Sequence, residues 1–381
     1  MQSKKITNQK SQTKNCTAVI RITGIVQGVG FRPFVYRTAQ QWEITGFVRN
    51  DKDGVFIEAS GKEANVEKFY NYIISHKPQQ AKIVLHSFEK IPDEKFSSFQ
   101  IVESEQKQSV QQLFITPDFA MCPRCKAELH DEKNRRFHYP FITCTDCGTR
   151  YSILKNLPFD RENTSMQAFR QCDECMREYN DANDIRFYSQ TNSCKNCGIK
   201  IQLFDKEKNE IIGDSEKLIS KIVTEISEGK IVAVKGIGGF LLLCDATNAA
   251  AIKILRKRKH RPTKPFAVMY PNLEQIKNDF FVNDFEKEML QSTAAPIVLL
   301  QRKKNSPLWI NENEVAPKLN RVGVFLPYAP LLELIVSAFA KPVIATSANI
   351  SGDSIIYQNE KALNDLPALA DFILLHNREI T

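Results

Sequence analysis

The sequence predicts a multidomain α+β protein, because three regions with different residue patterns follow one another along the chain. The first region alternates strand-like and helix-like patterns, the second carries a regular series of cysteine pairs, and the third is typical of α/β structure. A chain of 381 residues is also too long for one ordinary hydrophobic core. We expect a disordered tail over residues 1–16 and domains over residues 17–104, 113–201 and 212–381.

The first region predicts a ferredoxin-like βαββαβ domain. Alternating apolar residues predict strands, and apolar residues at helical spacing predict helices. The strands are expected at Ala18–Ile22, Ile44–Val48, Val55–Ala59, Ile83–Phe88 and Phe99–Val102, and the helices at Phe34–Glu43 and Glu63–His76. This order is typical of two helices on one face of an antiparallel sheet. The polar stretch over residues 104–112 is expected to be a linker.

Four Cys-x-x-Cys pairs occupy the second region, and the last two pairs repeat the first two at an offset of 50 residues. Within each half 18 residues separate the pairs, and Glu128/Glu178 and Arg136/Arg186 recur at the same offset. The region is therefore an internal duplication in which each copy carries four thiols. The eight residues are Cys122, Cys125, Cys144, Cys147, Cys172, Cys175, Cys194 and Cys197.

These thiols predict two structural Zn²⁺ sites. Tetrahedral zinc binds four soft ligands, and a full thiolate set leaves no position for a catalytic water. Disulfides are the alternative, but residues 1–14 are polar and basic without a signal-peptide core, and no run of 18 uncharged apolar residues follows. We therefore expect a cytoplasmic protein with reduced thiols and no membrane association. The spacing leaves open whether a metal is shared within one copy or between the two copies.

The third region predicts an α/β domain. A helix over residues 215–228 precedes a buried strand over residues 231–234, which leads into Lys235 and a glycine-rich loop. Further strands are expected at Phe266–Met269, Ile297–Leu300, Val322–Phe325 and Val343–Ala345. A last strand from Phe372 is expected to lead into more structure, which indicates a chain that is cut short. Cys16 and Cys244 lie outside the zinc pattern and are expected to be buried small hydrophobic residues.

The net charge of +8 is concentrated rather than spread. The run from Lys253 to Lys264 contains seven Lys or Arg residues and no acidic residue. Such a cluster favours a site for the phosphates of a nucleotide or a nucleic acid. A solvated helix face is the alternative interpretation.

A candidate phosphate site lies between the first strand and the first helix. The glycines between Gly24 and Arg32 let backbone N–H groups converge at a helix N-terminus, where an anion is favoured. Arg32 can grip two phosphate oxygens, and Asn50, at the end of the next strand, can orient a water molecule. These motifs resemble the acylphosphatase family over about residues 17–103. The resemblance implies that Asn50 positions the attacking water and that the phosphate is bound by Arg32 with Gln27, Gly28, Val29, Gly30 and Phe31. A fold kept as a binding module without turnover is the alternative.

A candidate nucleotide site combines three segments of the third region: Lys235 with its loop, the basic run, and the polar stretch from Thr346 to Gly352. The glycine-rich loop matches neither a Walker loop nor a dinucleotide-binding fingerprint. In this order the segments resemble the YrdC family, which makes carbamoyl-type adenylates from ATP. The resemblance implies Mg²⁺ with ATP, and ATP or carbamate contacts from Lys235, Lys257, Lys259, Arg261, Lys264, Ser347, Asn349 and Ser351. Leu241 departs from the pattern, because the hydrogenase-linked branch of the family commonly has His at this position.

The three regions in this order are similar to the HypF family, the carbamoyltransferases of nickel–iron hydrogenase maturation. The resemblance implies that carbamoyl phosphate is hydrolysed at the first site and that the carbamate is adenylated with ATP at the second. It also implies a further carbamoyl-transfer domain, which this sequence lacks, and a protein partner, HypE, whose C-terminal cysteine accepts the carbamoyl group.

Two other classes of protein remain as alternatives. A threonylcarbamoyladenylate synthase of tRNA modification would explain the third region but not the acylphosphatase motifs. A zinc-ribbon nucleic-acid-binding protein is disfavoured, because the cysteine repeats lack interleaved basic and aromatic residues.

Overall fold

The computed structural model describes residues 14–105, 114–303, 310–350 and 352–381. The chain divides into unit 1, Met1–Thr116 with Asn156–Asp160, and unit 2, Pro117–Lys155 with Arg161–Thr381. The predicted tail lies outside the described residues up to residue 13, but Asn15 and Cys16 already belong to a strand. Most of the predicted linker also lies outside the described residues. At its start, Ser104 donates to Asp160 and Glu105 pairs with Arg49, both within unit 1.

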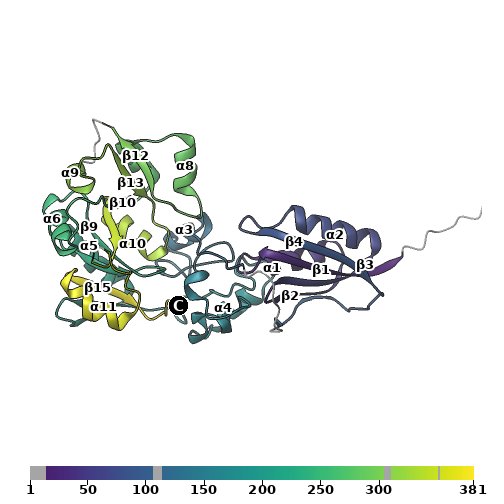
Figure 1. Ribbon diagram of the computed structural model, residues 1–381. Helices are drawn as coiled ribbons and strands as arrows, with labels where there is room; N and C mark the ends of the chain where they lie inside the picture. Colours follow the sequence, from purple (N-terminus) through teal and green to yellow (C-terminus); the bar gives the residue numbers. More distant parts are fainter. Residues whose placement is uncertain (1–13, 106–113, 304–309, 351) are drawn as a thin grey trace, which may run out of the picture. The chain divides into compact units, whose positions relative to one another are not determined.

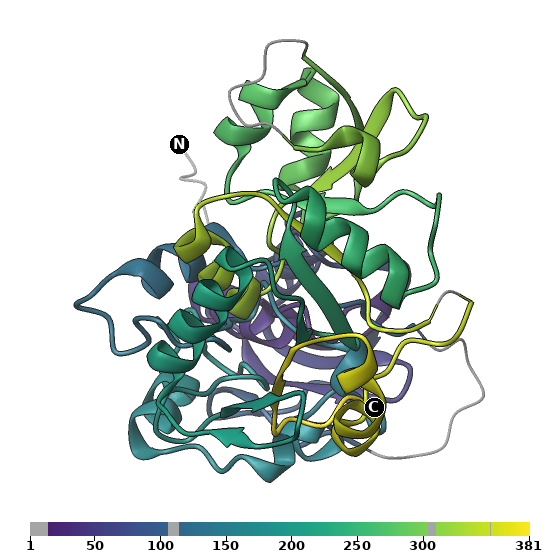
Figure 2. The same cartoon turned by 90° about the vertical axis from the view of Figure 1, so that its left-hand side faces the viewer.

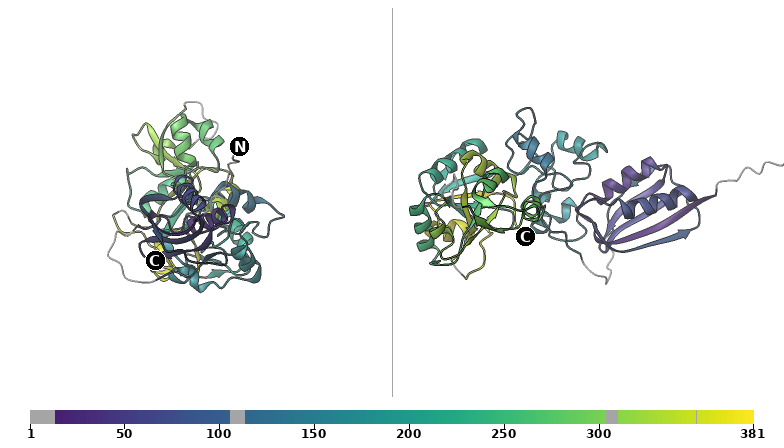
Figure 3. Two further views of the ribbon diagram at one scale, coloured as in Figure 1. Left: turned by 90° about the vertical axis from the view of Figure 1, so that its right-hand side faces the viewer. Right: turned by 90° about the horizontal axis from the view of Figure 1, so that it is seen from above.

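Unit 1 is a five-stranded sheet with two helices on one face. Its elements are β1 (Asn15–Ile25), α1 (Phe31–Gln41), β2 (Thr45–Asp51), β3 (Gly54–Lys62), α2 (Glu63–Ser75), β4 (Lys82–Ile91) and β5 (Phe99–Ile101). The strand order is β4-β1-β3-β2-β5, and Figures 1 and 3 show α1 and α2 on the same face of this sheet. The ferredoxin-like arrangement is confirmed. The expectation of a wholly antiparallel sheet is wrong in one place, because β5 pairs in parallel with β2.

The core of unit 1 lies between the sheet and the two helices. Alternate residues of β2 are buried, as the two-residue period of a strand predicts when one face is covered, whereas β1 and β3 also carry runs of consecutive buried residues. The buried side chains include Ala18, Ile20, Ile22, Val35, Ala39, Ile57, Val66, Phe69 and Ile73. Helix α1 begins at Phe31 rather than at the predicted Phe34. Pro33 is tolerated there because the first turn of a helix has no hydrogen-bond partner for its missing N–H.

Unit 2 contains a ten-stranded mixed sheet in the order β11-β12-β13-β10-β14-β9-β8-β15-β6-β7. The strands are β6 (Ile201–Asp205), β7 (Glu210–Ile211), β8 (Val232–Lys235), β9 (Phe240–Asp245), β10 (Ala267–Met269), β11 (Phe280–Phe281), β12 (Val298–Arg302), β13 (Arg321–Phe325), β14 (Val343–Ser347) and β15 (Phe372–His376). The strand predicted from Phe372 lies inside the sheet, parallel to β8 and antiparallel to β6. The sequence patterns did not predict β9, whose continuous apolar run is typical of a strand buried on both faces.

Helices cover both faces of this sheet. The helices are α5 (Ser215–Ser227), α6 (Ala249–Arg258), α7 (Leu273–Asp279), α8 (Asp284–Gln291), α9 (Glu312–Val315), α10 (Pro330–Phe339) and α11 (Asn359–Asp365). Helices α6, α7, α9 and α11 share one core with Leu242 and Cys244 of β9, whereas α5 and α10 pack against each other outside that core. Figure 2 shows α11 beside the last residues of the chain. The α/β expectation is confirmed, and Cys16 and Cys244 are buried as expected.

The cysteine-rich part of unit 2 has little regular structure. Each copy begins with a short helix, α3 (Pro123–His130) or α4 (Asp173–Asn180), and the N-cap of each is the first cysteine of its copy. Short 3-10 helices follow at Tyr151–Ile153, Arg161–Asn163 and Ser165–Ala168. Metal ligation by the cysteines would stabilise a segment with so few packed elements. Within the described ranges, no helix of the chain is long and apolar enough to cross a membrane.

Candidate active sites and metal clusters

The candidate phosphate loop connects β1 to α1 in unit 1. Gly28 (φ 69°) and Gly30 (φ 73°) adopt the left-handed backbone conformation that side chains disfavour, and Gly30 is the N-cap of α1. Val29 and Phe31 are each 1% exposed, so a ligand would meet only their backbone. Because the first N–H groups of a helix have no partner within the helix, the loop offers donors to an anion.

Arg32 and Asn50 lie in direct contact beside this loop. Arg32 is in the first turn of α1 and is 8% exposed, and Asn50 is near the end of β2 and is 1% exposed. With the amide oxygen of Asn50 turned toward Arg32, that oxygen accepts hydrogen bonds from Nη2 at 3.1 Å and from Nε at 3.2 Å. The fold therefore brings together the arginine and the amide on which the acylphosphatase resemblance rests.

Gln27 ties the loop to other parts of unit 1. Its side-chain nitrogen donates to the backbone oxygen of Gly54 at 2.8 Å, and its Oε1 accepts from the backbone N–H of Phe159 at 2.8 Å. Its own backbone oxygen accepts from Thr116 Oγ1 at 2.6 Å. The side chain of Gln27 is thus used to fix the loop, which leaves its backbone N–H for the phosphate contact that the resemblance implies.

A carboxylate that the sequence patterns did not predict joins this site. Asp160 Oδ1 accepts a hydrogen bond from Arg32 Nη2 at 2.6 Å, in an ion pair whose side chains are 9% exposed for Arg32 and 16% for Asp160. Ser104 donates to the other oxygen of Asp160 and lies 3.5 Å from Arg32 Nη1. No local pattern could have linked these residues, because 128 positions separate Arg32 from Asp160 and 56 separate Ser104 from Asp160.

The eight paired cysteines form two clusters, one in each copy. In the first copy the Sγ–Sγ distances are 3.7 Å for Cys122–Cys144, 3.8 Å for Cys144–Cys147 and 3.6 Å for Cys125–Cys147. The corresponding distances in the second copy are 3.7, 3.8 and 3.6 Å. A zinc ion about 2.3 Å from four thiolates places neighbouring sulfurs about 3.8 Å apart, so each cluster fits one structural zinc. Disulfides are excluded for these sulfurs, since an S–S bond is about 2.05 Å long. The pairs that share a metal therefore lie within one copy.

Reciprocal ion pairs join the two copies. Arg136 of the first copy donates to Glu178 of the second at 2.8 Å, and Arg186 of the second copy donates to Glu128 of the first. Each arginine also donates its Nε to a backbone oxygen of the other copy, at 2.9 and 3.1 Å. Burial works against the charged form of Arg136, yet Glu178 raises the pKa of Arg136 above its ordinary value. The recurring arginines and glutamates therefore connect the two copies through ion pairs.

Part of the predicted nucleotide site assembles around Lys259. Its Nζ donates to the backbone oxygens of Ser347 at 2.6 Å and Asn349 at 2.5 Å, and to Asn349 Oδ1 at 3.1 Å. Burial, together with the charges of Arg261 and Lys264, lowers the pKa of Lys259 to about 8. Because all three N–H donors of Lys259 have acceptors, this lysine fixes the Ser347–Asn349 turn and would act on a ligand through the position of that turn.

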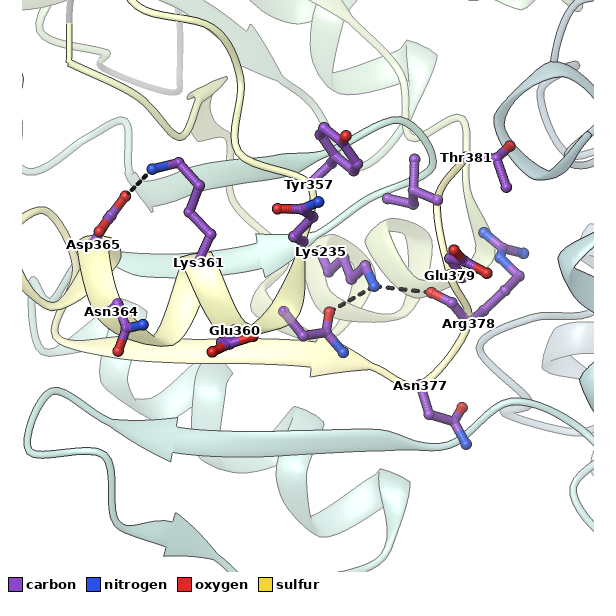
Figure 4. Close-up of a pocket in the computed structure, with 13 residues that line it drawn as sticks. Lys235, Tyr357, Glu360, Lys361, Asn364, Asp365, Asn377, Arg378, Glu379 and Thr381 are labelled. Atoms are coloured by element: carbon purple, nitrogen blue, oxygen red, sulfur yellow. Dashed lines mark hydrogen bonds and ion pairs between the residues drawn. The ribbon is translucent and has the colours of Figure 1, made fainter. Parts of the chain in front are cut away.

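Lys235 belongs to a second polar group, at the end of β8. Its Nζ donates to Asn359 Oδ1 at 2.6 Å and to the backbone oxygens of Arg378 at 2.9 Å and His376 at 3.2 Å. Burial, followed by the charge of Arg378, lowers the pKa of Lys235 to about 8. This group borders a cavity of about 830 Å³ lined by residues 357–361, 364, 365 and 377–381, and Figure 4 shows Lys235 among these residues.

The two lysine groups lie at the same end of the sheet. Lys235 pairs with Phe240, and Ser347 pairs with Leu241, the next residue of β9. Because β9 alone separates β8 from β14, the two backbones are about 10 Å apart. Leu241, the position that departs from the YrdC pattern, is thus the direct strand neighbour of Ser347.

The remaining residues of the basic run have different surroundings. Lys257 and Lys264 are exposed. Ser351, in the separate polar stretch from Thr346 to Gly352, lies outside the described residues. Arg256 donates to the backbone oxygen of Glu314 in α9, and Arg258 pairs with Asp371 at 2.8 Å. The interpretation of the whole run as a solvated helix face is therefore wrong, because several of its cations hold the fold together.

Two buried bases near the end of the chain were not predicted from the sequence. His376 is 1% exposed with its Nε2 3.4 Å from the Gly236 oxygen, and Arg378 is 5% exposed and lies 3.3 Å from Thr149 Oγ1. Burial, followed by the charges of Arg378 and Lys235, lowers the pKa of His376 well below its ordinary value. Burial lowers the pKa of Arg378 to about 10. Their clustering depends on the fold, and no spacing in the sequence signals it.

Three family models match the chain. The acylphosphatase model matches residues 18–101, the HypF finger model matches residues 121–154 and 172–204, and the model described as Telomere recombination, which includes YrdC proteins, matches residues 224–381. These three models follow one another in the order of the three sequence regions.

Similar proteins match either the whole chain or one of its parts. A carbamoyltransferase HypF from Synechocystis is 46% identical over 96% of this chain and 47% of that protein. An acylphosphatase from Pseudothermotoga lettingae is 39% identical over 22% of this chain and 93% of that protein. A threonylcarbamoyl-AMP synthase from Photobacterium profundum is 28% identical over 35% of this chain and 73% of that protein.

The fold agrees with these sequence matches. A crystal structure of full-length HypF in the phosphate- and nucleotide-bound form superposes with a TM-score of 0.90 at 39% identity, and covers 96% of this chain and 47% of that chain. The chain thus spans about half the length of the HypF proteins that it matches. Because the finger model, the relatives that match nearly the whole of this chain and the superposition agree, the chain belongs to the HypF family.

Proposed function

We propose that unit 1 hydrolyses carbamoyl phosphate. The contact between Arg32 and Asn50 at the N-terminus of α1, on an acylphosphatase fold, carries this proposal. The guanidinium and the backbone N–H groups of the loop bind the phosphate, and Asn50 orients a water molecule. The water oxygen bonds to phosphorus, the bond from phosphorus to the bridging oxygen breaks, and carbamate, phosphate and a proton are released. Preorganised donors around the phosphate supply most of the rate acceleration.

Unit 2 then joins the carbamate to ATP. A carbamate oxygen bonds to the α-phosphorus of ATP, and pyrophosphate leaves. The residues that we propose for the ATP and carbamate site are Lys235, Lys257, Lys259, Arg261, Lys264, Ser347, Asn349 and Ser351, with Lys259 acting through the Ser347–Asn349 turn. The Lys235 group and the turn that Lys259 fixes lie at one end of the sheet, which supports this assignment. Mg²⁺ is proposed to accompany ATP, bound mainly by phosphate oxygens, as this ion usually is in ATP sites.

The carbamoyl adenylate is proposed to serve the carbamoylation of a C-terminal cysteine of HypE. We assign that transfer to the part of the HypF proteins that this chain does not match. The two cysteine clusters have a structural role in this scheme. Their reduced thiols fit a cytoplasmic protein, since structural disulfides are rare in that compartment.

Threonylcarbamoyl-AMP synthesis is the weaker assignment. The threonylcarbamoyl-AMP synthase matches only 35% of the chain, and the family model that includes YrdC proteins spans residues 224–381, which contain neither Arg32 nor Asn50. An enzyme that starts from threonine has no need of an acylphosphatase domain. Carbamoyl phosphate accounts for both units, because hydrolysis in unit 1 produces the acid that unit 2 activates.

Phosphate release from carbamoyl phosphate tests the first site. Arg32→Ala should lower kcat/KM at least about 100-fold, the typical effect of removing one preorganised donor. Arg21→Ala is the matched control, because Arg21 is exposed on β1 and stacks on Phe56 away from the Arg32–Asn50 contact. The assignment is wrong if the wild-type chain releases no phosphate, or if Arg32→Ala is as active as Arg21→Ala.

A further inference from the structure

Asp160 reaches the candidate phosphate site from outside the region that acylphosphatases share. The acylphosphatase family model ends at residue 101, and the similar acylphosphatase is almost completely covered by 84 residues of this chain. Asp160 lies in the segment Asn156–Asp160, which belongs to unit 1 although its sequence neighbours on both sides belong to unit 2. The chain therefore adds a carboxylate to a site that is otherwise built from a common scaffold.

This segment is attached to the phosphate loop itself. Phe159 is 4% exposed, and its N–H donates to Gln27 Oε1 at 2.8 Å. The N–H of Asp160 donates to the Pro158 oxygen at 2.8 Å, which closes a tight turn. The backbone next to Asp160 is thus held by the same residue, Gln27, that fixes the loop.

The carboxylate of Asp160 can still accept a hydrogen bond from a ligand. Arg32 Nη2 donates to its Oδ1 at 2.6 Å, and Ser104 donates to its Oδ2. An ionised carboxylate offers about four lone-pair positions, and these two contacts occupy one on each oxygen. The side chain of Asp160 also keeps 16% of its surface exposed. A group bound next to Arg32 would therefore meet an acceptor that is partly free.

A carboxylate in this position opposes a phosphate ligand unless the ligand supplies a donor. It balances the charge of Arg32 and repels phosphate oxygens, because like charges close together are unfavourable. Acetyl phosphate has no N–H to offer. In carbamoyl phosphate an amino group is bonded to the carbonyl carbon beside the bridging oxygen, so its N–H donors lie close to the phosphate.

We propose that Asp160 is a specificity-determining residue of the unit 1 site. Its carboxylate accepts a hydrogen bond from the amino group of carbamoyl phosphate and disfavours acyl phosphates that lack N–H. This inference rests on the proposed hydrolysis of carbamoyl phosphate and adds the residue that distinguishes this substrate from other acyl phosphates.

The test uses the full chain and compares two substrates, carbamoyl phosphate and acetyl phosphate, with one ligand, inorganic phosphate. Asp160→Ala and Asp160→Asn are assayed for phosphate release from carbamoyl phosphate and acetyl phosphate, and inorganic phosphate binding is measured by calorimetry. The ratio of kcat/KM for carbamoyl phosphate over acetyl phosphate should fall about 10- to 100-fold in Asp160→Ala, the effect of losing one hydrogen bond to a charged group. Binding of inorganic phosphate, which has no N–H, should tighten in both variants.

Glu89→Gln is the control for the loss of one negative charge, because Glu89 is exposed on β4. Asp160→Asn keeps the size of the side chain, and a thermal melt of each variant shows whether it is folded. If kcat/KM for both substrates and the affinity for inorganic phosphate all rise together, Asp160 only competes with phosphate. If all three fall together, Asp160 only positions Arg32. Either result overturns the proposal. If the wild-type chain hydrolyses neither substrate, the proposed function fails, and the role of Asp160 fails with it.

Discussion

The ion pair between Arg136 and Glu178 predicts a large loss of stability when its negative charge is removed. In Glu178→Gln the shape is kept, but Arg136, which is 1% exposed, loses its carboxylate and faces an amide N–H. Breaking one side of a fully buried pair costs about 3–5 kcal/mol. The side chain of Glu178 is 18% exposed, so water screens part of this charge and about 2–3 kcal/mol is expected. At about 2–4 °C per kcal/mol for a unit of this size, Tm should fall by about 4–12 °C.

Glu174→Gln provides the matched control for this substitution. Glu174 is 51% exposed and lies 3.5 Å from Arg135, and exposed ion pairs of this kind contribute only about 0–1 kcal/mol. Differential scanning calorimetry of the zinc-saturated chain measures both variants, and metal analysis shows whether both zinc ions are kept. If Glu178→Gln unfolds at the same temperature as Glu174→Gln, the reciprocal pairs do not brace the two copies, and the reasoning is refuted.

Two further predictions concern the nucleotide site and the metal. Nucleotide binding should weaken as pH rises through about 8, because the pKa of Lys259 is about 8 and the ammonium group that fixes Ser347 and Asn349 exists below that pH and is lost above it. Titration calorimetry should show Kd for ATP rising by up to about tenfold per pH unit above 8, and a constant Kd between pH 7 and 9.5 would contradict this role. Cys144→Ser should lose one of two zinc ions and lower the stability of unit 2. The rate of phosphate release from carbamoyl phosphate in unit 1 should change much less. A variant that kept full carbamoyl-phosphate-dependent ATP–pyrophosphate exchange would argue against a geometric role for the metal.

The metal ligands could be predicted from the sequence because their chemistry depends on local spacing. Two cysteines three positions apart at the start of a helix, such as Cys122 and Cys125, face one ion in almost any fold that contains them. Which pairs share the ion depends on how distant segments meet, and the spacing could not decide it. The same limit applies to Arg136 and Glu178. Their recurrence at a fixed offset is visible in the sequence, but their contact across the two copies is not.

The residue types of the candidate active sites could be predicted from the sequence. The hydrogen bonds and ion pairs that these residues make could not. Arg32 and Asn50 belong to two motifs, each close to a strand end, so topology brings them together. Asp160 comes from a segment 128 positions away, and no spacing in the sequence links it to Arg32. Lys235 and Lys259 stood out by charge, but only the fold reveals that nearby oxygens accept from their ammonium groups. A sequence shows which groups are charged, and long-range packing decides whether they face a ligand or the protein.

Carbamoyl-phosphate-dependent exchange of pyrophosphate into ATP tests the central claim most directly, because it requires both units of one chain. The wild-type chain should catalyse exchange when carbamoyl phosphate is present and should not when threonine replaces it. Arg32→Ala should abolish the exchange, since no carbamate is then formed in unit 1. Exchange that depends on threonine, or that continues unchanged in Arg32→Ala, would contradict the proposal that carbamate made in unit 1 is adenylated in unit 2.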